Sequence, residues 1–280
     1  MTLAAILMAT LVAGIGSVWL AALLSYGLLA RYTQHMLSLA AGALLATAFM
    51  HLLPEAFESQ ASAHELFATL LVGLVFFFLL DKAELWHHGH EHHHPVPAEN
   101  AAALVVAGAP HSHDDHHDHH HGHSGHGHQH ASGSWAVLTG DSVHCFGDGV
   151  LIASAFVADM RLGFVAAIAV LMHEIPHHMG DLAVLRQSSN KRLAVLKVSL
   201  AGALTALGGV VGYFLVAQLE QYLPFFLVVA SSSFLYVALA DLIPQLQKKL
   251  SAGETAAQIV WLAVGIGMVM LVSSLGHAMP

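Results

Sequence analysis

The chain has 280 residues, of which 56% are hydrophobic and only 10% are charged, and its mean hydropathy is +0.65. A soluble domain carries about 25% charged residues, so this composition excludes an ordinary soluble protein. The net charge of -9 comes without a basic patch, which gives no support to a nucleic-acid partner. The single cysteine, Cys145, excludes an intrachain disulfide.

Apolar runs of about 20 residues are long enough to cross a lipid bilayer as helices. We predict an all-α membrane protein with eight such spans, at residues 3–30, 34–57, 64–86, 133–158, 162–186, 193–217, 223–246 and 256–278. The first run has no basic segment before it and is too long for a signal peptide, so we interpret it as a retained span. The expected organisation is residues 1–86 with three spans, a loop at 87–132, and residues 133–280 with five spans.

Lysine and arginine residues predict the orientation of these spans, because short cytoplasmic loops carry an excess of both. Of the two residue types, only Arg161 falls on the side of the even-numbered connections. The other side receives Arg31, Lys82, Arg186, Lys191, Arg192, Lys197, Lys248 and Lys249. We therefore expect the odd-numbered connections in the cytoplasm and both termini outside.

The third connection is rich in histidine. Of the 25 histidines, 17 lie between His87 and His130, with the densest run reading HSHDDHHDHHHGHSGHGHQH. Such tracts bind metal ions and do not build a packed core. We expect a disordered cytoplasmic loop that captures or senses metal, the alternative being a solvated linker without a role in transport. Because it lies outside the membrane, it is not the expected transport site.

Two short stretches place potential metal ligands inside spans. His144 and Asp148 are four residues apart in the fourth span, so they share one helix face. His173 and His177 have the same spacing in the fifth span, and Asp181 extends their stripe. Two facing helices would bring both pairs to one point, and four nitrogen and oxygen ligands suit a tetrahedral Zn²⁺ ion.

A second stripe is offset by one residue and contains Cys145, Glu174 and His178. It predicts an adjacent second site, with Asp148 and His177 as bridges between the two. Ionisable side chains in a membrane are costly unless they are paired, and they mark ion pathways by default. The alternative is a polar network that only holds helices together.

Prolines accompany these polar residues. Pro176 removes one backbone hydrogen bond and frees the carbonyl of Met172, which predicts a helix break beside the site. Prolines recur in HLLPEA of the second span and ADLIPQ of the seventh. Broken helices beside a site at mid-membrane are typical of secondary transporters. The candidates for lining an ion path are His51, Glu55, Asp181 and Asp241.

With HCFGDG and HEIPHHMGD in place, the chain resembles the ZIP (Zrt/Irt-like protein) family of divalent-metal transporters, in the branch with HNxxDG and HExPHExGD. The likeness covers nearly the whole chain. It implies an eight-helix homodimer in the lipid bilayer that imports Zn²⁺, with Cd²⁺, Fe²⁺ and Mn²⁺ as further substrates. It implies neither an enzyme nor a catalytic cofactor. The primary-site ligands of the family correspond to His144, Asp148, His173 and His177, and the secondary-site positions to Cys145 and Glu174.

Two positions depart from the pattern of that branch. Cys145 stands where the branch has asparagine, and His178 stands where it has a second glutamate, which removes one negative charge. A thiolate binds zinc or cadmium more tightly than an amide does. The softer ligands favour Zn²⁺ over Fe²⁺ or Mn²⁺.

The mechanism expected from these features is alternating access in the cytoplasmic (inner) membrane of a bacterium. An ion enters from outside, binds the centre in competition with protons, and leaves past His51, Glu55 and Asp241 toward the loop histidines. Three alternatives are weighed against it. HEIPH matches the HExxH motif of zinc metalloproteases. The others are an exporter of the cation-diffusion-facilitator type, which has six spans and a C-terminal domain, and a membrane-bound metal sensor or buffer.

Overall fold

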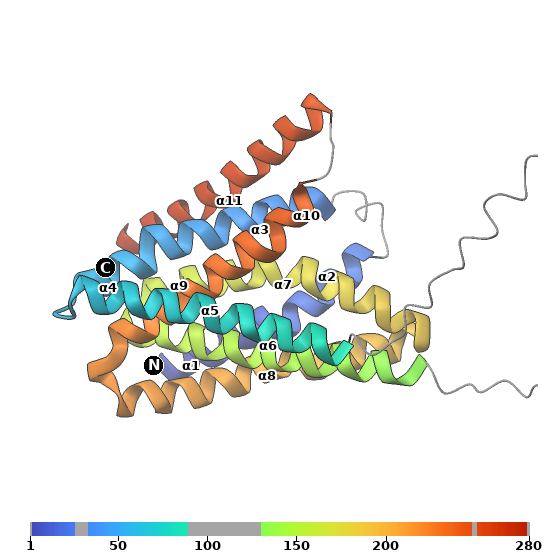
Figure 1. Ribbon diagram of the computed structural model, residues 1–280, viewed down its shortest axis with the longest axis horizontal. Helices are drawn as coiled ribbons and strands as arrows, with labels where there is room; N and C mark the ends of the chain where they lie inside the picture. The colour runs from blue at the N-terminus through green and yellow to red at the C-terminus, as the bar shows by residue number, and fades with distance from the viewer. Residues whose placement is uncertain (1, 26–32, 89–129, 248–250, 279–280) are drawn as a thin grey trace, which may run out of the picture.

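The computed structural model describes residues 2–25, 33–88, 130–247 and 251–278, and within these ranges the chain is helical with no strand (Figure 1). The prediction for the histidine-rich loop falls almost entirely outside the described residues. In the described part of the chain, eight helices are long and apolar enough to cross a membrane, and they agree with the eight predicted spans to within a few residues at most ends. The all-α fold is therefore confirmed.

Three spans are composite and five are single helices. Span 1 comprises α1 (Thr2–Leu11), a π-helical turn η1 (Val12–Gly16) and α2 (Ser17–Ser25). Span 2 comprises α3 (Thr33–Thr47), the π-helical turn η3 (Ala48–Leu52) and α4 (Leu53–Phe57). Spans 3 to 6 are α5 (Ala63–His88), α6 (His130–Ala158), α7 (Met160–Ser188) and α8 (Lys191–Gln218). Span 7 comprises η5 (Glu220–Tyr222), α9 (Leu223–Tyr236), the π-helical turn η6 (Val237–Leu242) and α10 (Ile243–Leu246), and span 8 is α11 (Ala252–Ala278).

Polar residues at the helix starts explain several of the boundaries. Before α5, the Ser62 backbone N–H donates to Glu65 Oε2 at 3.1 Å, and the Glu65 N–H donates back to Ser62 Oγ at 3.2 Å. This reciprocal pair is a capping box, which satisfies two of the N–H groups left free at a helix start. Asn190 caps α8 by accepting from the Leu193 N–H at 2.8 Å. The chain therefore turns between spans at residues suited to stop one helix and begin the next.

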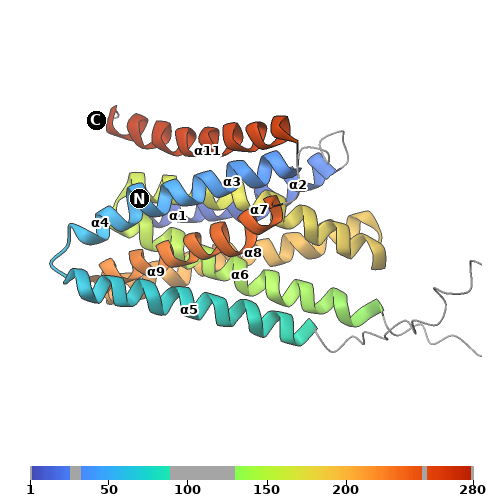
Figure 2. The ribbon, with the colours of Figure 1, turned by 45° about the horizontal axis from the view of Figure 1, so that its top comes forward.

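The spans form an antiparallel bundle, in which the helix ends next to the odd-numbered connections lie at one end and those next to the even-numbered connections lie at the other (Figure 1). Helix α6 packs against both α7 and α8, and α7 also contacts α8. Helix α11 packs on α3 along one side of the bundle, and α5 packs on α9 along the opposite side (Figure 2). Large apolar side chains of α5, such as Phe67, Leu71 and Phe76, are exposed, as expected for a surface that faces lipid.

Spans 2 and 7 share an unusual local structure. Each contains a π-helical turn that is followed directly by a short helix with proline in its first turn, Pro54 in α4 and Pro244 in α10. The two spans run in opposite directions, and each π-turn packs against the main helix of the other span (Figure 1). A π-turn interrupts the regular hydrogen-bond ladder and often marks a functional position. His51 and Asp241 lie in these two turns, so the predicted breaks in spans 2 and 7 are present.

Pro176 behaves differently from these two prolines. Helix α7 continues as an α-helix from Met160 to Ser188 with Pro176 inside it. The expectation of a helix break at Pro176 is therefore wrong. Within a long helix that packs against neighbours on several sides, the loss of one hydrogen bond is tolerated, because packing holds the backbone on both sides of the proline.

The backbones of α6 and α8 lie in direct contact, which fixes where the ligands of α6 sit. A Cβ atom added at Gly149 would collide with the carbonyl oxygen of Thr205, and one added at Gly208 would collide with the carbonyl oxygen of Phe146. Small residues allow membrane helices to approach this closely. The buried core is built largely from alanine and leucine side chains contributed by spans 1, 2, 4, 5 and 7.

Candidate metal centre

Helices α6 and α7 are joined by a single residue, Asp159, which sets how they face each other. Its carboxylate Oδ1 accepts from the backbone N–H groups of Arg161 at 2.8 Å and Leu162 at 3.2 Å, and so caps the start of α7. An aspartate in this position stabilises a helix start by about 1 kcal/mol. The tight connection makes α6 and α7 an antiparallel pair, and this places HCFGD opposite HEIPHHMGD.

The first group of converging side chains contains His144, Asp148, His173 and Glu174, whose ligand atoms all lie within 4.8 Å of one another. The Nε2 atoms of His144 and His173 are 3.3 Å apart, and each lies 3.3 Å from Glu174 Oε1. Asp148 Oδ2 lies 3.2 Å from His173 Nε2 and 3.9 Å from His144 Nε2. Nitrogen and oxygen ligands at about 2.1 Å from a tetrahedral Zn²⁺ ion lie about 3.4 Å from each other. The spacing of this group therefore fits one such ion.

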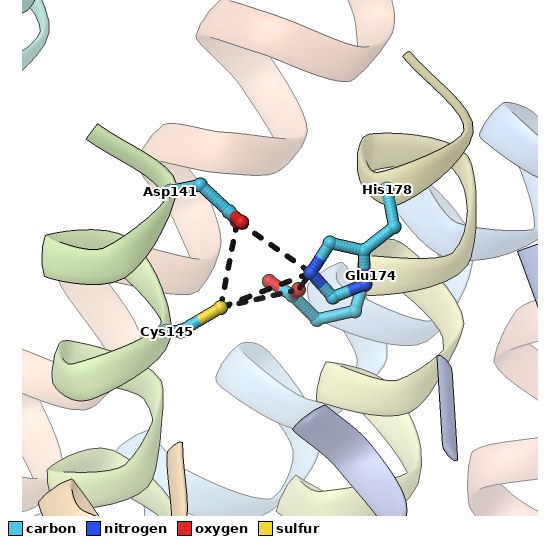
Figure 3. A group of neighbouring side chains, drawn as sticks. All are labelled: Asp141, Cys145, Glu174 and His178. Atoms are coloured by element: carbon cyan, nitrogen blue, oxygen red, sulfur yellow. Dashed lines mark hydrogen bonds and ion pairs between the residues drawn. The ribbon is translucent and has the colours of Figure 1, made fainter. Parts of the chain in front are cut away.

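The second group contains Asp141, Cys145, Glu174 and His178, and all four side chains are buried (Figure 3). His178 Nε2 lies 2.9 Å from Glu174 Oε2 and 3.5 Å from Asp141 Oδ1. Cys145 Sγ lies 3.5 Å from Asp141 Oδ1, 3.7 Å from Glu174 Oε2 and 3.8 Å from His178 Nε2. The longer distances to sulfur agree with the longer Zn–S bond of about 2.3 Å. This group offers a second, fully enclosed set of four ligands.

Glu174 belongs to both groups. Its Oε1 faces the two histidines of the first group, and its Oε2 faces His178 in the second. The structure therefore places Glu174 between the two sets, where the sequence predicted Asp148 and His177. The reason is the rotation of α7, which points residue 174 between the two stripes of α6.

His177 lies beside the first group and not within it. Its Nδ1 is 3.3 Å from Asp181 Oδ2 and 3.7 Å from Asp141 Oδ1, so these three residues form a third group. Its ring stacks on that of His144, with centroids 5.1 Å apart and an angle of 23° between the planes. His177 is also more exposed than the other candidate ligands, with 35% of its side chain accessible. The predicted tetrad thus keeps three members together and exchanges His177 for Glu174.

A pocket of about 350 Å³ reaches this third group. His173, His177 and Asp181 line it on the side of the metal ligands, and Asp241 lines it on the side of span 7. Its other lining residues are Leu37, Asp81, Pro176, Gly180, Leu242 and Gln245. The pocket therefore joins the candidate centre to two of the four predicted path residues.

The other two predicted path residues, His51 and Glu55, lie elsewhere. Glu55 is in α4, at the end of the bundle where the even-numbered connections lie, whereas α10, which follows Asp241, lies toward the opposite end (Figure 1). His51 is half-buried, with Nδ1 3.4 Å from the Ala46 carbonyl, and Glu55 is exposed. One release route past His51, Glu55 and Asp241 does not fit this arrangement, because spans 2 and 7 run in opposite directions.

The backbone selects which nitrogen of His173 is free. Its Nδ1 lies 3.3 Å from the carbonyl oxygen of Ala169, which can only accept a hydrogen bond. In the neutral ring that metal binding requires, Nδ1 therefore carries the proton, and Nε2 presents its lone pair to the first group. Metal-binding histidines are commonly oriented by such a bond from the other ring nitrogen.

Several buried carboxylate oxygens at the centre lack a hydrogen bond. They include Asp141 Oδ2, Asp148 Oδ2 and Glu174 Oε1. Buried polar atoms in native proteins nearly always have a partner, and unpaired buried charges are costly. Here acceptor atoms of carboxylates converge with acceptor nitrogens of imidazoles, an arrangement that a cation would stabilise.

Asp141 is the one member of these groups that was absent from the sequence prediction. It stands four residues before Cys145, so it lies on the same face of α6 as the second stripe. The same spacing that paired His144 with Asp148 was therefore available to identify it.

Known proteins are similar to this chain over half of its length or more. The model of the family described as ZIP Zinc transporter matches residues 1–273. Zinc transporter ZIP13 of Gallus gallus is 28% identical, over 87% of this chain and 74% of its own length. Zinc transporter ZIP13 of Homo sapiens is 26% identical, over 86% of this chain and 70% of its own length. Zinc transporter foi of Drosophila melanogaster is 32% identical, but the match covers 50% of this chain and only 20% of that protein.

Proposed function

The chain belongs to the ZIP zinc transporter family and is an integral membrane protein, and we propose that it imports divalent metal ions, chiefly Zn²⁺, into the cytoplasm by alternating access. The single observation that carries this proposal is the spacing of ligand atoms in the first group, where four separations of 3.2–3.3 Å match the edges of a tetrahedral zinc site. The family match favours transport over the metalloprotease and exporter alternatives.

In this proposal the transported ion binds first to His144, Asp148, His173 and Glu174. The second group holds a second ion through Asp141, Cys145, Glu174 and His178. Two negative charges in the first group offset the charge of one divalent ion, which limits the cost of burying it. Imidazole and thiolate ligands suit Zn²⁺ and Cd²⁺ better than Fe²⁺ or Mn²⁺, and we expect the latter two to be poorer substrates.

His177 and Asp181 form the exit step in this proposal. His177 stacks on His144 and faces Asp181, so an ion that leaves the first group meets a nitrogen and then a carboxylate at the wall of the pocket. Asp241 lies on the far wall. His51 and Glu55 belong to the opposite, entry side. The excess of lysine and arginine at the odd-numbered connections supports this direction, because it assigns that end to the cytoplasm.

The remaining parts of the proposal concern the surroundings of the transporter. We place it in the cytoplasmic membrane of a bacterium as a homodimer, with both termini outside and the histidine-rich loop at residues 87–132 in the cytoplasm. The loop would collect ions released from the pocket, because its imidazoles bind the same metals. The protein has no catalytic role in this scheme.

Zinc uptake into proteoliposomes tests the proposal. We expect His173→Ala to reduce uptake at least about 100-fold, because loss of a direct ligand should exceed the 10–100-fold cost typical of an outer partner. His64→Ala is the matched control, since His64 is exposed at the start of α5 and far from the groups in sequence. Uptake by His173→Ala equal to that of the control variant would show that ions do not pass through this centre.

A further inference from the structure

Ser17, the first residue of α2 in span 1, contacts the second group from outside. Its Oγ lies 2.6 Å from the carbonyl oxygen of Gly14 and 3.0 Å from Nδ1 of His178. Ser17 and His178 are both completely buried. The hydroxyl therefore meets two partners in a place where water does not compete for either one.

The chemistry of the two partners fixes the direction of both hydrogen bonds. The carbonyl oxygen of Gly14 can only accept, so the single hydroxyl proton of Ser17 goes to it. The lone pair of Ser17 Oγ then faces Nδ1 of His178, which must donate. Metal binding requires a neutral imidazole, in which only one nitrogen carries a proton, so Nε2 of His178 is then the nitrogen with a free lone pair.

That lone pair points at the other members of the second group. His178 Nε2 lies 2.9 Å from Glu174 Oε2 and 3.5 Å from Asp141 Oδ1. With the opposite tautomer, Nε2 would carry a proton directed at these oxygens, and no nitrogen lone pair would face the site. An ionised carboxylate at position 178 would present an acceptor oxygen to the site however it turned. An imidazole presents a lone pair to the site only when the proton is on its other nitrogen.

We infer that Ser17 is a positioning residue, which holds His178 in the Nδ1-protonated tautomer and so makes Nε2 a metal ligand of the second group. The inference rests on the proposed function, because it takes the second group to be a metal site. Ser17 acts through His178 and does not itself reach the ion. Outer partners of metal-binding histidines commonly have this role, and their loss typically lowers metal affinity 10–100-fold.

Tight packing of span 1 holds Ser17 in place. A Cβ atom added at Gly14 would collide with the carbonyl oxygen of Gly202 in α8, and would come within 2.6 Å of Thr205 Oγ1. Gly14 lies in the π-helical turn η1, directly before Ser17. The Gly14 carbonyl that accepts the hydrogen bond from Ser17 is therefore part of a close helix contact, so its orientation is fixed.

Cobalt titration of the purified, metal-free protein tests the inference. Because Cys145 is the only cysteine, a sulfur-to-cobalt charge-transfer band reports on the second group alone. We expect Ser17→Ala to weaken Co²⁺ binding, followed through this band, by about 10–100-fold. Thr10→Val is the matched control in the same span. It removes another fully buried hydroxyl, which bonds only to the carbonyls of its own helix, and it should leave the titration unchanged.

A second background separates positioning from general packing. In His178→Ala protein, which still contains Cys145, adding Ser17→Ala should cause no further loss of Co²⁺ affinity, because the histidine it positions is gone. An equal loss in both backgrounds, or an unchanged titration of Ser17→Ala alone, would overturn the inference and leave the proposed function standing. Absence of the band in the unaltered protein would instead overturn the second site of the proposed function.

A spectroscopic measurement tests the tautomer directly. In ¹⁵N NMR spectra of the zinc-loaded protein, the signals lost in His178→Ala identify His178. We expect a ring that binds the metal through Nε2 and carries its proton on Nδ1. A ring bound through Nδ1 would overturn the inference.

Discussion

Replacing Glu174 by glutamine should separate the two proposed metal sites, because this one side chain serves both. Its Oε1 lies 3.3 Å from the Nε2 atoms of His144 and His173, and its Oε2 lies 2.9 Å from His178 Nε2. Glutamine has almost the same shape but only one oxygen. Whichever way the amide turns, one group keeps a neutral oxygen, and the other receives an NH₂ group that cannot bind a metal.

We therefore expect the centre of Glu174→Gln to bind one Zn²⁺ ion where that of the unaltered protein binds two, apart from any ions held by the histidine-rich loop. The remaining site loses a charged ligand, so its affinity should fall at least about 100-fold, equivalent to about 2.7 kcal/mol. The metal-free protein should remain folded, because the new NH₂ group can donate a hydrogen bond to the Nε2 lone pair of a neighbouring histidine. This separates a loss of binding from a loss of structure.

Titration calorimetry in detergent and zinc uptake in proteoliposomes would measure stoichiometry, affinity and transport. Glu220→Gln is the control, because Glu220 is exposed in the short helix η5. A Glu174→Gln protein that binds the same number of ions as the control variant, with unchanged affinity, would refute the bridging position of Glu174 and the argument built on its two oxygens.

Two further predictions concern the exit step and the packing of the ligand helices. Asp181→Asn should lower the maximal rate of zinc uptake about tenfold with little change in the half-saturating zinc concentration. The reason is that the first group stays intact and only the step past His177 is impaired. A raised half-saturating concentration at an unchanged maximal rate would contradict this. Gly149→Ala should destabilise the protein by about 1–3 kcal/mol in thermal unfolding in detergent, since its Cβ would collide with the backbone of Thr205. Gly147→Ala on the same helix meets open space and should be neutral or slightly stabilising, so equal stability of the two variants would refute the packing argument.

The fold was predictable because its signals are local. Each span is an apolar run whose length matches a bilayer, and the alternation of lysine and arginine depends only on the number of spans. The four-residue spacing of His144 with Asp148, and of His173 with His177, also follows from helix geometry alone. These features need no knowledge of how one helix packs on another.

The details of the centre were not predictable in the same way. Helical spacing tells which residues share a face, but it does not give the rotation of α7 relative to α6. That rotation places Glu174 between the two groups and turns His177 toward Asp181. It depends on how α6 and α7 pack against each other and against α8, which is a tertiary feature.

Ser17 shows the same limit at longer range. A lone serine in an apolar helix has no pattern around it, and its partner His178 is 161 residues away in the sequence. Only the packing of span 1 against α7 and α8 brings the two together. The π-helical turns were not recognisable as such from the sequence, although Pro54 and Pro244 marked two of the three places where they occur in the described residues.

The one-residue connection at Asp159 has a consequence for how such a protein can diversify. Every proposed ligand, from Asp141 to Asp181, lies on the single hairpin formed by α6 and α7. A recombination event that exchanged this one contiguous segment between relatives would transfer a complete set of metal donors. Ser17 would stay behind, because it belongs to span 1. A protein that acquires histidine at position 178 by such an exchange would therefore also need a serine at position 17, which the exchanged segment does not carry.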